Sequence, residues 1–300
     1  MNRSSGRPEA NNFPPGDGAR RAGECIPSAR EIPLGSNELR LVIATSGLAF
    51  VTLDRPQVHN AFDEPQIERL IRAFESLGID DSVRAVVLRG TGRHFCAGAD
   101  IGWMRRAAQA DEANNIDDAR RFSCMMRAVA NCPKPVVAVV QGAAFGGGMG
   151  LVCAADIVLA AEDARFALTE AKFGILPAVV GPYVVNAVGR RWAIELALTC
   201  RTLSAPQAQA IGLVHQVAAT DELDAALLDV LRGLLRSGPM ALCEIKSLLG
   251  RLSQRQIDDA TADLTARTIA RVRATSEAKE GFAAFIDKRE PGWVKEPRLD

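Results

Sequence analysis

The sequence predicts an α/β fold with a layered core, in which short apolar strands alternate with helices. Apolar runs of strand length occur at 85–88, 135–140 and 156–160, and helical spacing of apolar residues separates them. Beyond about residue 181 the pattern becomes almost entirely helical. Alternation of strand and helix implies right-handed crossovers between parallel strands. We therefore expect a mainly parallel sheet covered by helices, followed by a helical C-terminal part.

The individual elements follow one another at intervals that suit this fold. Residues 39–53 are typical of two short strands around Ser46-Gly47, and apolar residues then recur at helical spacing from Ile67 to Leu77. Another helix is expected across 117–130, before the strand that begins at Pro135. In the C-terminal part we expect a short strand at 213–217 and helices at 223–234, 240–252 and 257–286.

Composition divides the chain into three parts. Residues 1–36 are rich in Gly, Pro, Ser, Asn, Arg and Glu and lack hydrophobic periodicity, which is typical of a disordered N-terminal leader. Acidic residues and consecutive prolines there argue against an amphipathic targeting helix, and no apolar run resembles a secretion signal. We assign residues 37–200 to an α/β core with the active site and residues 201–300 to a mainly helical C-terminal part.

The overall composition argues against several classes of partner. The chain has 300 residues, with 36 basic and 36 acidic side chains, so there is no basic excess for nucleic acid. No apolar run reaches transmembrane length without a charge or glycine. The 7 cysteines include no C-x-x-C pair, so neither a disulfide framework nor a metal site is expected. These features favour a reducing, cytoplasmic compartment.

A glycine-rich turn at 140–151 joins an apolar strand to an apolar helix start. Main-chain N–H groups can approach a ligand closely there, and a helix N-terminus favours negative charge. A tight turn with close helix packing is the alternative interpretation. A second small-residue turn, at 93–101, follows the strand 85–90. Two such turns can direct two N–H groups at one oxygen, which would make an oxyanion site.

Several ordered motifs together resemble the crotonase family, also called the enoyl-CoA hydratase/isomerase family. They are Thr52–Pro56 followed by Asn60-Ala61-Phe62, then Phe95–Asp100, Gly142–Gly148, and Asp156–Ala160 leading to Phe166–Glu170. The resemblance extends from about Glu38 to about Pro291. It implies a crotonase-type spiral of repeated strand-strand-helix units with a C-terminal helical trimerisation part, and therefore a homo-trimer or a hexamer.

The resemblance also implies a substrate and a set of site residues. The substrate would be an acyl-CoA thioester, and coenzyme A would be part of that substrate, with no separate cofactor. The thioester oxygen would lie between the backbone N–H groups of Ala99 and Gly147, and Glu170 would be the catalytic base. Substrate and CoA contacts map by motif onto Ala61, Phe95, Ala97, Gly98, Asp100, Ile101, Gly146 and Gly150.

Residue patterns alone leave the role of Glu170 open. It lies between two apolar stretches, where burial is expected to raise the pKa of a carboxyl group towards working pH. The alternative is a surface glutamate at the end of a strand. Asp100 is expected to be a turn or helix-capping residue, and Cys96 an apolar filler rather than a reactive thiol. His59 and His94 have no third group in the sequence that would complete a catalytic triad.

One position departs from the best-known family pattern. Hydratases with two glutamates carry one of them two residues after the glycine triplet, where this chain has Gly150. A single carboxylate suffices to move a proton between a 3-enoyl and a 2-enoyl thioester, which favours an isomerase. However, the segments 98–106, 168–180 and 280–289 resemble bacterial methylglutaconyl-CoA hydratases, which include members with glycine at this position.

We therefore expect a hydratase-type lyase in which Glu170 activates a water molecule that adds at C3. The alternatives are a one-glutamate isomerase and a noncatalytic member that binds acyl-CoA or RNA. A methylglutaconyl-like substrate would carry a distal carboxylate, which needs a cationic or hydrogen-bonding partner. Arg105, Arg106, Lys172 and Tyr183 are candidates for that partner, and each is also typical of a solvated or packed side chain.

Overall fold

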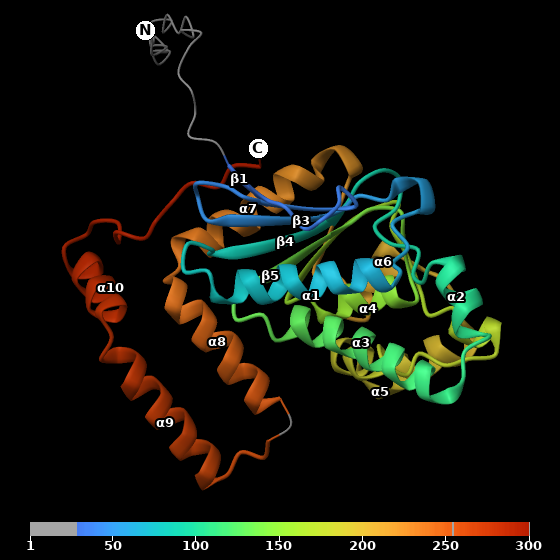
Figure 1. Ribbon diagram of the computed structural model, residues 1–300. Helices are drawn as coiled ribbons and strands as arrows, with labels where there is room; N and C mark the ends of the chain where they lie inside the picture. Colours follow the sequence, from blue (N-terminus) through green and yellow to red (C-terminus); the bar gives the residue numbers. More distant parts are fainter. Residues whose placement is uncertain (1–28, 254, 300) are drawn as a thin grey trace, which may run out of the picture.

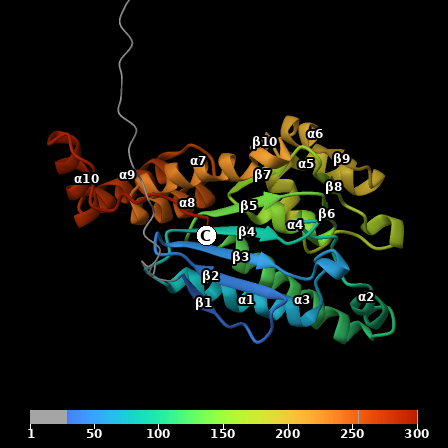
Figure 2. The same ribbon diagram turned by 90° about the horizontal axis from the view of Figure 1, so that it is seen from above.

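A seven-stranded sheet forms the centre of the molecule in the computed structural model, which describes residues 29–253 and 255–299 (Figure 1). Its spatial order is β1-β2-β3-β4-β5-β7-β10, and the strands lie side by side in that order in Figure 2. The bounds are β1 (Arg30–Ile32), β2 (Leu39–Ile43), β3 (Leu48–Leu53), β4 (Ala85–Gly90), β5 (Val136–Val140), β7 (Ile157–Ala161) and β10 (Gln216–Ala218). From β3 to β10 neighbouring strands are parallel, whereas β1 and β2 pair antiparallel at one edge. The predicted α/β fold is confirmed.

Helices cover both faces of this sheet because its strands are apolar on both sides. In β3, Leu48 and Phe50 pack in a cluster with α7 (Leu223–Arg236). Their neighbours Ala49 and Val51 belong to the larger core on the other face, with α1 (Glu64–Ile79) and α3 (Glu112–Ala130). Side chains alternate between faces along a strand, so one apolar run fills two helix–sheet interfaces. The result is a three-layered core.

A separate three-stranded sheet, which the sequence does not predict, adjoins helices α4 (Gly147–Ala154) and α6 (Ala205–Ala210). It consists of β6 (Ala143–Phe145), β8 (Arg165–Ala167) and β9 (Leu203–Ser204). An isolated bridge between Cys96 and Ala144 connects β6 to the loop that follows β4. Strands of two or three residues are too short to show a recognisable alternation, so only tertiary pairing reveals them.

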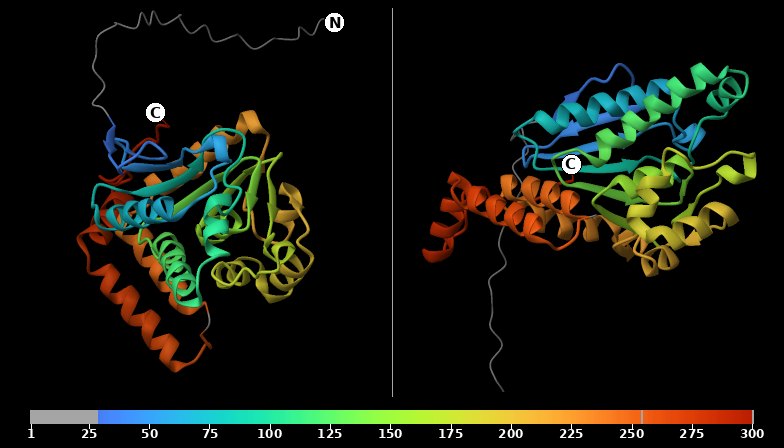
Figure 3. Two further views of the ribbon diagram at one scale, coloured as in Figure 1. Left: turned by 45° about the vertical axis from the view of Figure 1, so that its right-hand side comes forward. Right: turned by 90° about the horizontal axis from the view of Figure 1, so that it is seen from below.

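The remaining helices carry the site and the C-terminal extension. They are α2 (Ile101–Ala107), α4 (Gly147–Ala154), α5 (Gly181–Thr199), α6 (Ala205–Ala210), α8 (Pro239–Leu252), α9 (Asp259–Arg273) and α10 (Ser276–Ile286), with the short 3-10 helices η1 (Pro56–Val58), η2 (Glu170–Phe173) and η3 (Thr220–Glu222). Helices α8 to α10 extend from the side of the sheet-containing body (Figures 1 and 3). The single helix expected at 257–286 is two helices, because the Thr275 side chain accepts from the Ala278 N–H and starts α10.

One expected boundary differs from the observed elements. Most of the predicted leader, residues 1–28, lies outside the described residues, but residues 30–32 within it form β1 rather than a disordered segment. Pairing with the free edge of β2 and contact of Ile32 with the core stabilise that strand. The short strand expected at 213–217 within the mainly helical C-terminal part is present as β10, where Val217 pairs with Ala160 of β7 and extends the sheet.

None of the helices in the described part of the chain is long and apolar enough to cross a membrane. Among residues 29–253 and 255–299, no cluster of three or more His, Cys, Asp or Glu side chains is placed to hold a metal ion.

Candidate active site

A cavity of about 530 Å³ opens between α2, α3, the start of α4 and the segment 170–180. Its volume lies in the range of about 300–1,000 Å³ that is typical of small-molecule sites. Ala99, Gly147 and Glu170, which the sequence places far apart, all line its wall. The three residues expected to be catalytic therefore meet in one cavity.

The peptide at Ala99 is oriented by a single parallel bridge to Phe62. The Phe62 N–H donates to the Gly98 carbonyl at 2.9 Å, and the Asp100 N–H donates to the Phe62 carbonyl at 3.0 Å. The groups of Ala99 itself therefore point away from Phe62, and its N–H finds no acceptor among the described residues. Position 98 requires glycine for two reasons. Its φ is +101°, which residues with a side chain rarely adopt, and a Cβ there would be too close to the Phe145 carbonyl oxygen, at 2.9 Å.

The second donor belongs to the first residue of α4, Gly147. The N–H groups in the first turn of a helix have no internal acceptor, and the helix dipole adds partial positive charge there. Gly146, with a φ of +50°, turns the chain into this helix while its own N–H donates to the Ala167 carbonyl at 2.8 Å. A Cβ on Gly98 would lie 3.8 Å from the Gly147 nitrogen, so the two turns are adjacent. Two free N–H groups thus belong to one cavity wall, as an oxyanion site requires.

Glu170 begins η2 and brings its carboxylate to the start of α4. A Cβ on Gly146 would lie 3.3 Å from Glu170 Oε1, while Glu170 Oε2 is buried and has no hydrogen-bond partner among the described residues. Burial raises the pKa of the Glu170 carboxyl group, and the nearby N–H groups of Glu170 and Thr169 oppose this rise. A partly desolvated carboxylate beside two N–H donors is suited to take up and return a proton.

The raised pKa of Glu170 predicts an acidic limb in the pH dependence of turnover. A base must be ionised, so activity is present above its folded-state pKa and is lost as pH falls through it. Because burial shifts this pKa upward, we expect the midpoint of the limb in kcat/KM to lie above 4.5, the ordinary value for glutamate. A profile of kcat/KM against pH, within the pH range in which the enzyme stays folded, measures this midpoint. A flat profile from pH 5 to 8, with the limb at or below 4.5, would contradict the shift.

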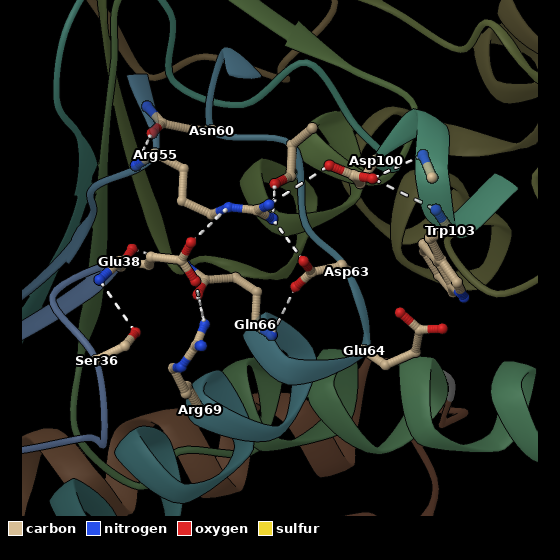
Figure 4. A network of polar contacts seen from close by, with 12 residues as sticks. Ser36, Glu38, Arg55, Asn60, Asp63, Glu64, Gln66, Arg69, Asp100 and Trp103 are labelled. Carbon is tan, nitrogen blue, oxygen red and sulfur yellow. Dashed lines mark hydrogen bonds and ion pairs between the residues drawn. The ribbon is translucent and has the colours of Figure 1, made fainter. Parts of the chain in front are cut away.

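A buried arginine holds together the segments that carry Ala99 (Figure 4). The Arg55 guanidinium donates to the Ala61 carbonyl at 2.8 Å and lies 3.1 Å from Asp63 and 3.4 Å from Asp100. A third carboxylate, that of Glu38, lies 3.5 Å from its Nε. Asp63 caps the N-terminus of α1 and Asp100 caps that of α2, as expected for Asp100. One side chain therefore joins two helix starts on either side of the Ala99 peptide.

Replacement of Arg55 by methionine is expected to destabilise the fold strongly. The Arg55 side chain is 10% exposed, and its loss leaves the carboxylates of Asp63 and Asp100, 19% and 20% exposed, without their cation. Removing one partner of a buried ion pair costs about 3 to 5 kcal/mol. Urea unfolding measures the change, with Arg106→Met as the matched control. Arg106 is 60% exposed in its pair with Glu64, so solvent screens this pair and its replacement should cost far less than that of Arg55. Equal effects of the two variants would refute the structural role of Arg55.

The other predicted contact residues shape the site without lining the cavity. Phe95 is fully buried, its N–H donates to the Gln141 carbonyl, and the Ala97 N–H donates to the His59 carbonyl. Ile101 is 68% exposed at the start of α2. Gly150 is buried in α4, where a Cβ would lie 2.3 Å from Val180 Cγ1. A glutamate at position 150 would therefore require Val180 to move.

Burial shifts the pKa values of two side chains near the site, His94 and Cys96. His94 Nδ1 accepts a hydrogen bond from the Ala143 N–H at 3.0 Å, and burial lowers the pKa of His94. Complete burial raises the pKa of the Cys96 thiol to about 12, which agrees with the expectation that Cys96 is an apolar filler.

The walls of the cavity beyond the reacting groups could not be predicted from the sequence. Phe62, Trp103 and Phe122 form an aromatic cluster with ring centroids 5.3 to 6.1 Å apart, and all three line the cavity. Asn115 and Asp118 line it from α3. Asn115, Asp118 and Phe122 are spaced so that they lie on one face of a helix. Polar residues at positions where an amphipathic helix is normally apolar were the signal in the sequence that could have identified this wall.

Known proteins share most of this chain's length and its fold. The family model for enoyl-CoA hydratase/isomerase matches residues 44–296. This chain belongs to the enoyl-CoA hydratase/isomerase family. A crystal structure of an enoyl-CoA hydratase from Shewanella pealeana superimposes with a TM-score of 0.82 at 39% identity, covering 85% of this chain and 96% of that chain.

Two curated members of the enoyl-CoA hydratase/isomerase family illustrate the range of acyl groups. A 2,3-dehydroadipyl-CoA hydratase from Escherichia coli is 33% identical over 242 residues, which is 80% of this chain and 92% of that protein. A carnitinyl-CoA dehydratase from Salmonella heidelberg is 31% identical over 255 residues, covering 81% and 93%. Membership of the family therefore leaves the acyl group of the substrate open.

Proposed function

We propose that this protein is an enoyl-CoA hydratase, a lyase that adds water across the double bond of a 2-enoyl-CoA through a thioester enolate. The observation that supports it most directly is the meeting of the Glu170 carboxylate with the N–H groups of Ala99 and Gly147 in one cavity. Donors directed at developing negative charge contribute about 3 kcal/mol each to transition-state stabilisation.

In this reaction the Glu170 carboxylate acts first as a base and then, once protonated, as an acid. Glu170 takes a proton from water, the resulting hydroxide forms a bond to C3, and the electron pair of the double bond moves onto the thioester to form the enolate. The N–H groups of Ala99 and Gly147 stabilise the enolate oxygen. Protonated Glu170 then returns its proton to C2, which restores the thioester and the carboxylate. Both hydrogen atoms and the oxygen of water end on the product.

The second candidate is a 3-enoyl-CoA to 2-enoyl-CoA isomerase, which Gly150 in place of a second glutamate favours. The distinguishing experiment follows the absorbance of the conjugated enoyl thioester with crotonyl-CoA, 3-methylglutaconyl-CoA and 3-hexenoyl-CoA in parallel. Loss of absorbance with the first two supports hydration. A gain with the third alone refutes it and supports isomerisation. Acyl-CoA binding without any absorbance change would support a noncatalytic member.

Among the described residues that line the cavity, none is a cation that could pair with the distal carboxylate of the expected methylglutaconyl-like substrate. Arg105, Arg106 and Lys172 are exposed, Arg106 is paired with Glu64, and none of them lines the cavity. Tyr183 does not line it either. We therefore limit the proposal for this chain to hydration of an enoyl-CoA.

Assembly as a homo-trimer or hexamer stays a prediction. Exposed apolar side chains on α10 support it, because Phe282, Phe285 and Ile286 are 58%, 85% and 75% exposed in the single chain. Apolar residues gathered on an extended helix are typical of an interface between subunits.

A further inference from the structure

The wall of the cavity carries negative charge and no positive charge. Among the described residues that line it, Glu170 and Asp118 are carboxylates, and none is Lys, Arg or His. The remaining lining is mostly alanine, methionine, branched aliphatic and aromatic side chains. With the thioester oxygen at Ala99 and Gly147, the acyl chain would extend into a space lined mainly by apolar side chains, with Asn115 and Asp118 as the polar groups on α3.

Asp118 is held firmly in this wall. Its side chain is 19% exposed, and one oxygen accepts a hydrogen bond from Trp103 Nε1. Its other oxygen lies 3.6 Å from Nη1 of Arg121, whose side chain is 52% exposed and does not line the cavity. Arg121 is therefore a largely solvated partner, and the Asp118 carboxylate is the member of this pair that lines the cavity.

This lining is expected to bind an alkyl end and a carboxylate end of the acyl group with different affinities. An alkyl end packs against Phe62, Phe122 and Met104 and gains from leaving water. A carboxylate end would lose its hydration, would meet no cation on the wall, and would be repelled by Asp118 and Glu170. Like charges brought together in a partly desolvated site discriminate strongly against the wrong partner.

We propose that the cavity selects enoyl-CoA substrates with an uncharged acyl end, and that Asp118 is the residue that excludes acyl groups ending in a carboxylate. This inference rests on the proposed hydratase function and names its substrate class. Asp118 is a specificity residue here and takes no part in proton transfer.

The test compares two six-carbon substrates that differ only at the far end, 2-hexenoyl-CoA and 2,3-dehydroadipyl-CoA. For the wild-type enzyme we expect kcat/KM to be about 100-fold higher for hexenoyl-CoA. In Asp118→Asn the amide oxygen can still accept from Trp103 Nε1, but the charge is gone. We expect the ratio to fall by about tenfold, because kcat/KM rises for the diacid. A ratio of two substrates on one enzyme is insensitive to a general loss of folded protein.

Two further variants test whether loss of the Asp118 charge causes the change in the substrate ratio. Asp117→Asn removes the same charge from the adjacent residue, which is 59% exposed, pairs with Arg120 and does not line the cavity, so it should leave the ratio unchanged. Asp118→Asn/Arg121→Gln should keep the relaxed ratio, because the effect comes from the lost carboxylate and not from a freed guanidinium. A wild-type preference for the diacid, an unchanged ratio in Asp118→Asn, or a return to the wild-type ratio in the double variant would each overturn the proposal.

A binding measurement separates this inference from the proposed function. Calorimetric titration with the saturated pair hexanoyl-CoA and adipoyl-CoA needs no turnover. Tighter binding of hexanoyl-CoA, relaxed in Asp118→Asn, supports the selectivity even if no enoyl-CoA is hydrated, in which case the hydratase assignment alone fails. Equal binding of the two in the wild type refutes the selectivity even if hexenoyl-CoA is hydrated.

Discussion

Glu170→Gln is expected to lower the turnover of a 2-enoyl-CoA by about 10²- to 10⁴-fold, because a positioned acid/base group contributes that much to proton transfer. The amide matches the carboxylate in shape, and the oxyanion donors belong to the backbone of Ala99 and Gly147, so binding of the thioester should persist. Calorimetric titration with a saturated acyl-CoA measures binding, and the absorbance assay measures turnover. The acidic limb of the pH profile should vanish from any residual activity.

Glu195→Gln is the matched control for this variant. Glu195 lies on α5, pairs with Arg201 at 2.6 Å, and also has a buried carboxylate oxygen without a hydrogen-bond partner among the described residues. It does not line the cavity. Its replacement should leave turnover near the wild-type value. Near-wild-type turnover in Glu170→Gln would remove Glu170 from the role of base.

Gly147→Val is expected to lower kcat/KM by about 10²- to 10³-fold, the usual effect of losing one oxyanion donor. A Cβ on Gly147 would lie 2.3 Å from Phe62 Cζ and 3.1 Å from Phe122 Cζ. Phe62 is completely buried, so the ring cannot retreat easily and the helix start must shift instead. That shift displaces the N–H group that holds the enolate oxygen.

Two variants separate displacement of the donor from general unfolding. Gly233→Ala adds a Cβ on α7 where nothing lies within 4 Å, so it should leave activity unchanged, and it should not lower the melting temperature because alanine favours a helix over glycine. Phe62→Leu in the Gly147→Val background removes the atom that causes the clash and should recover part of the lost activity. Full activity in Gly147→Val alone would show that its N–H is not one of the donors.

The sequence predicted the parts of the fold that depend on local pattern. Apolar runs such as 136–140 formed central strands, and the spacing from Ile67 to Leu77 formed the buried face of α1. Elements that depend on pairing partners were missed. Strand β1 is polar and three residues long, and the second sheet consists of segments whose only stabilisation is contact with distant parts of the chain.

The sequence by itself determined the two glycine turns and the family. Gly98 and Gly146 adopt positive φ values that few other residues tolerate, so the backbone donors are encoded locally. Only the tertiary structure decided the environment of Glu170 and the charge of the cavity wall. A raised pKa depends on desolvation, and electrostatic exclusion depends on which charges share one space. Both are set by segments such as α3 and η2, which lie far apart in the sequence and meet only in the folded chain.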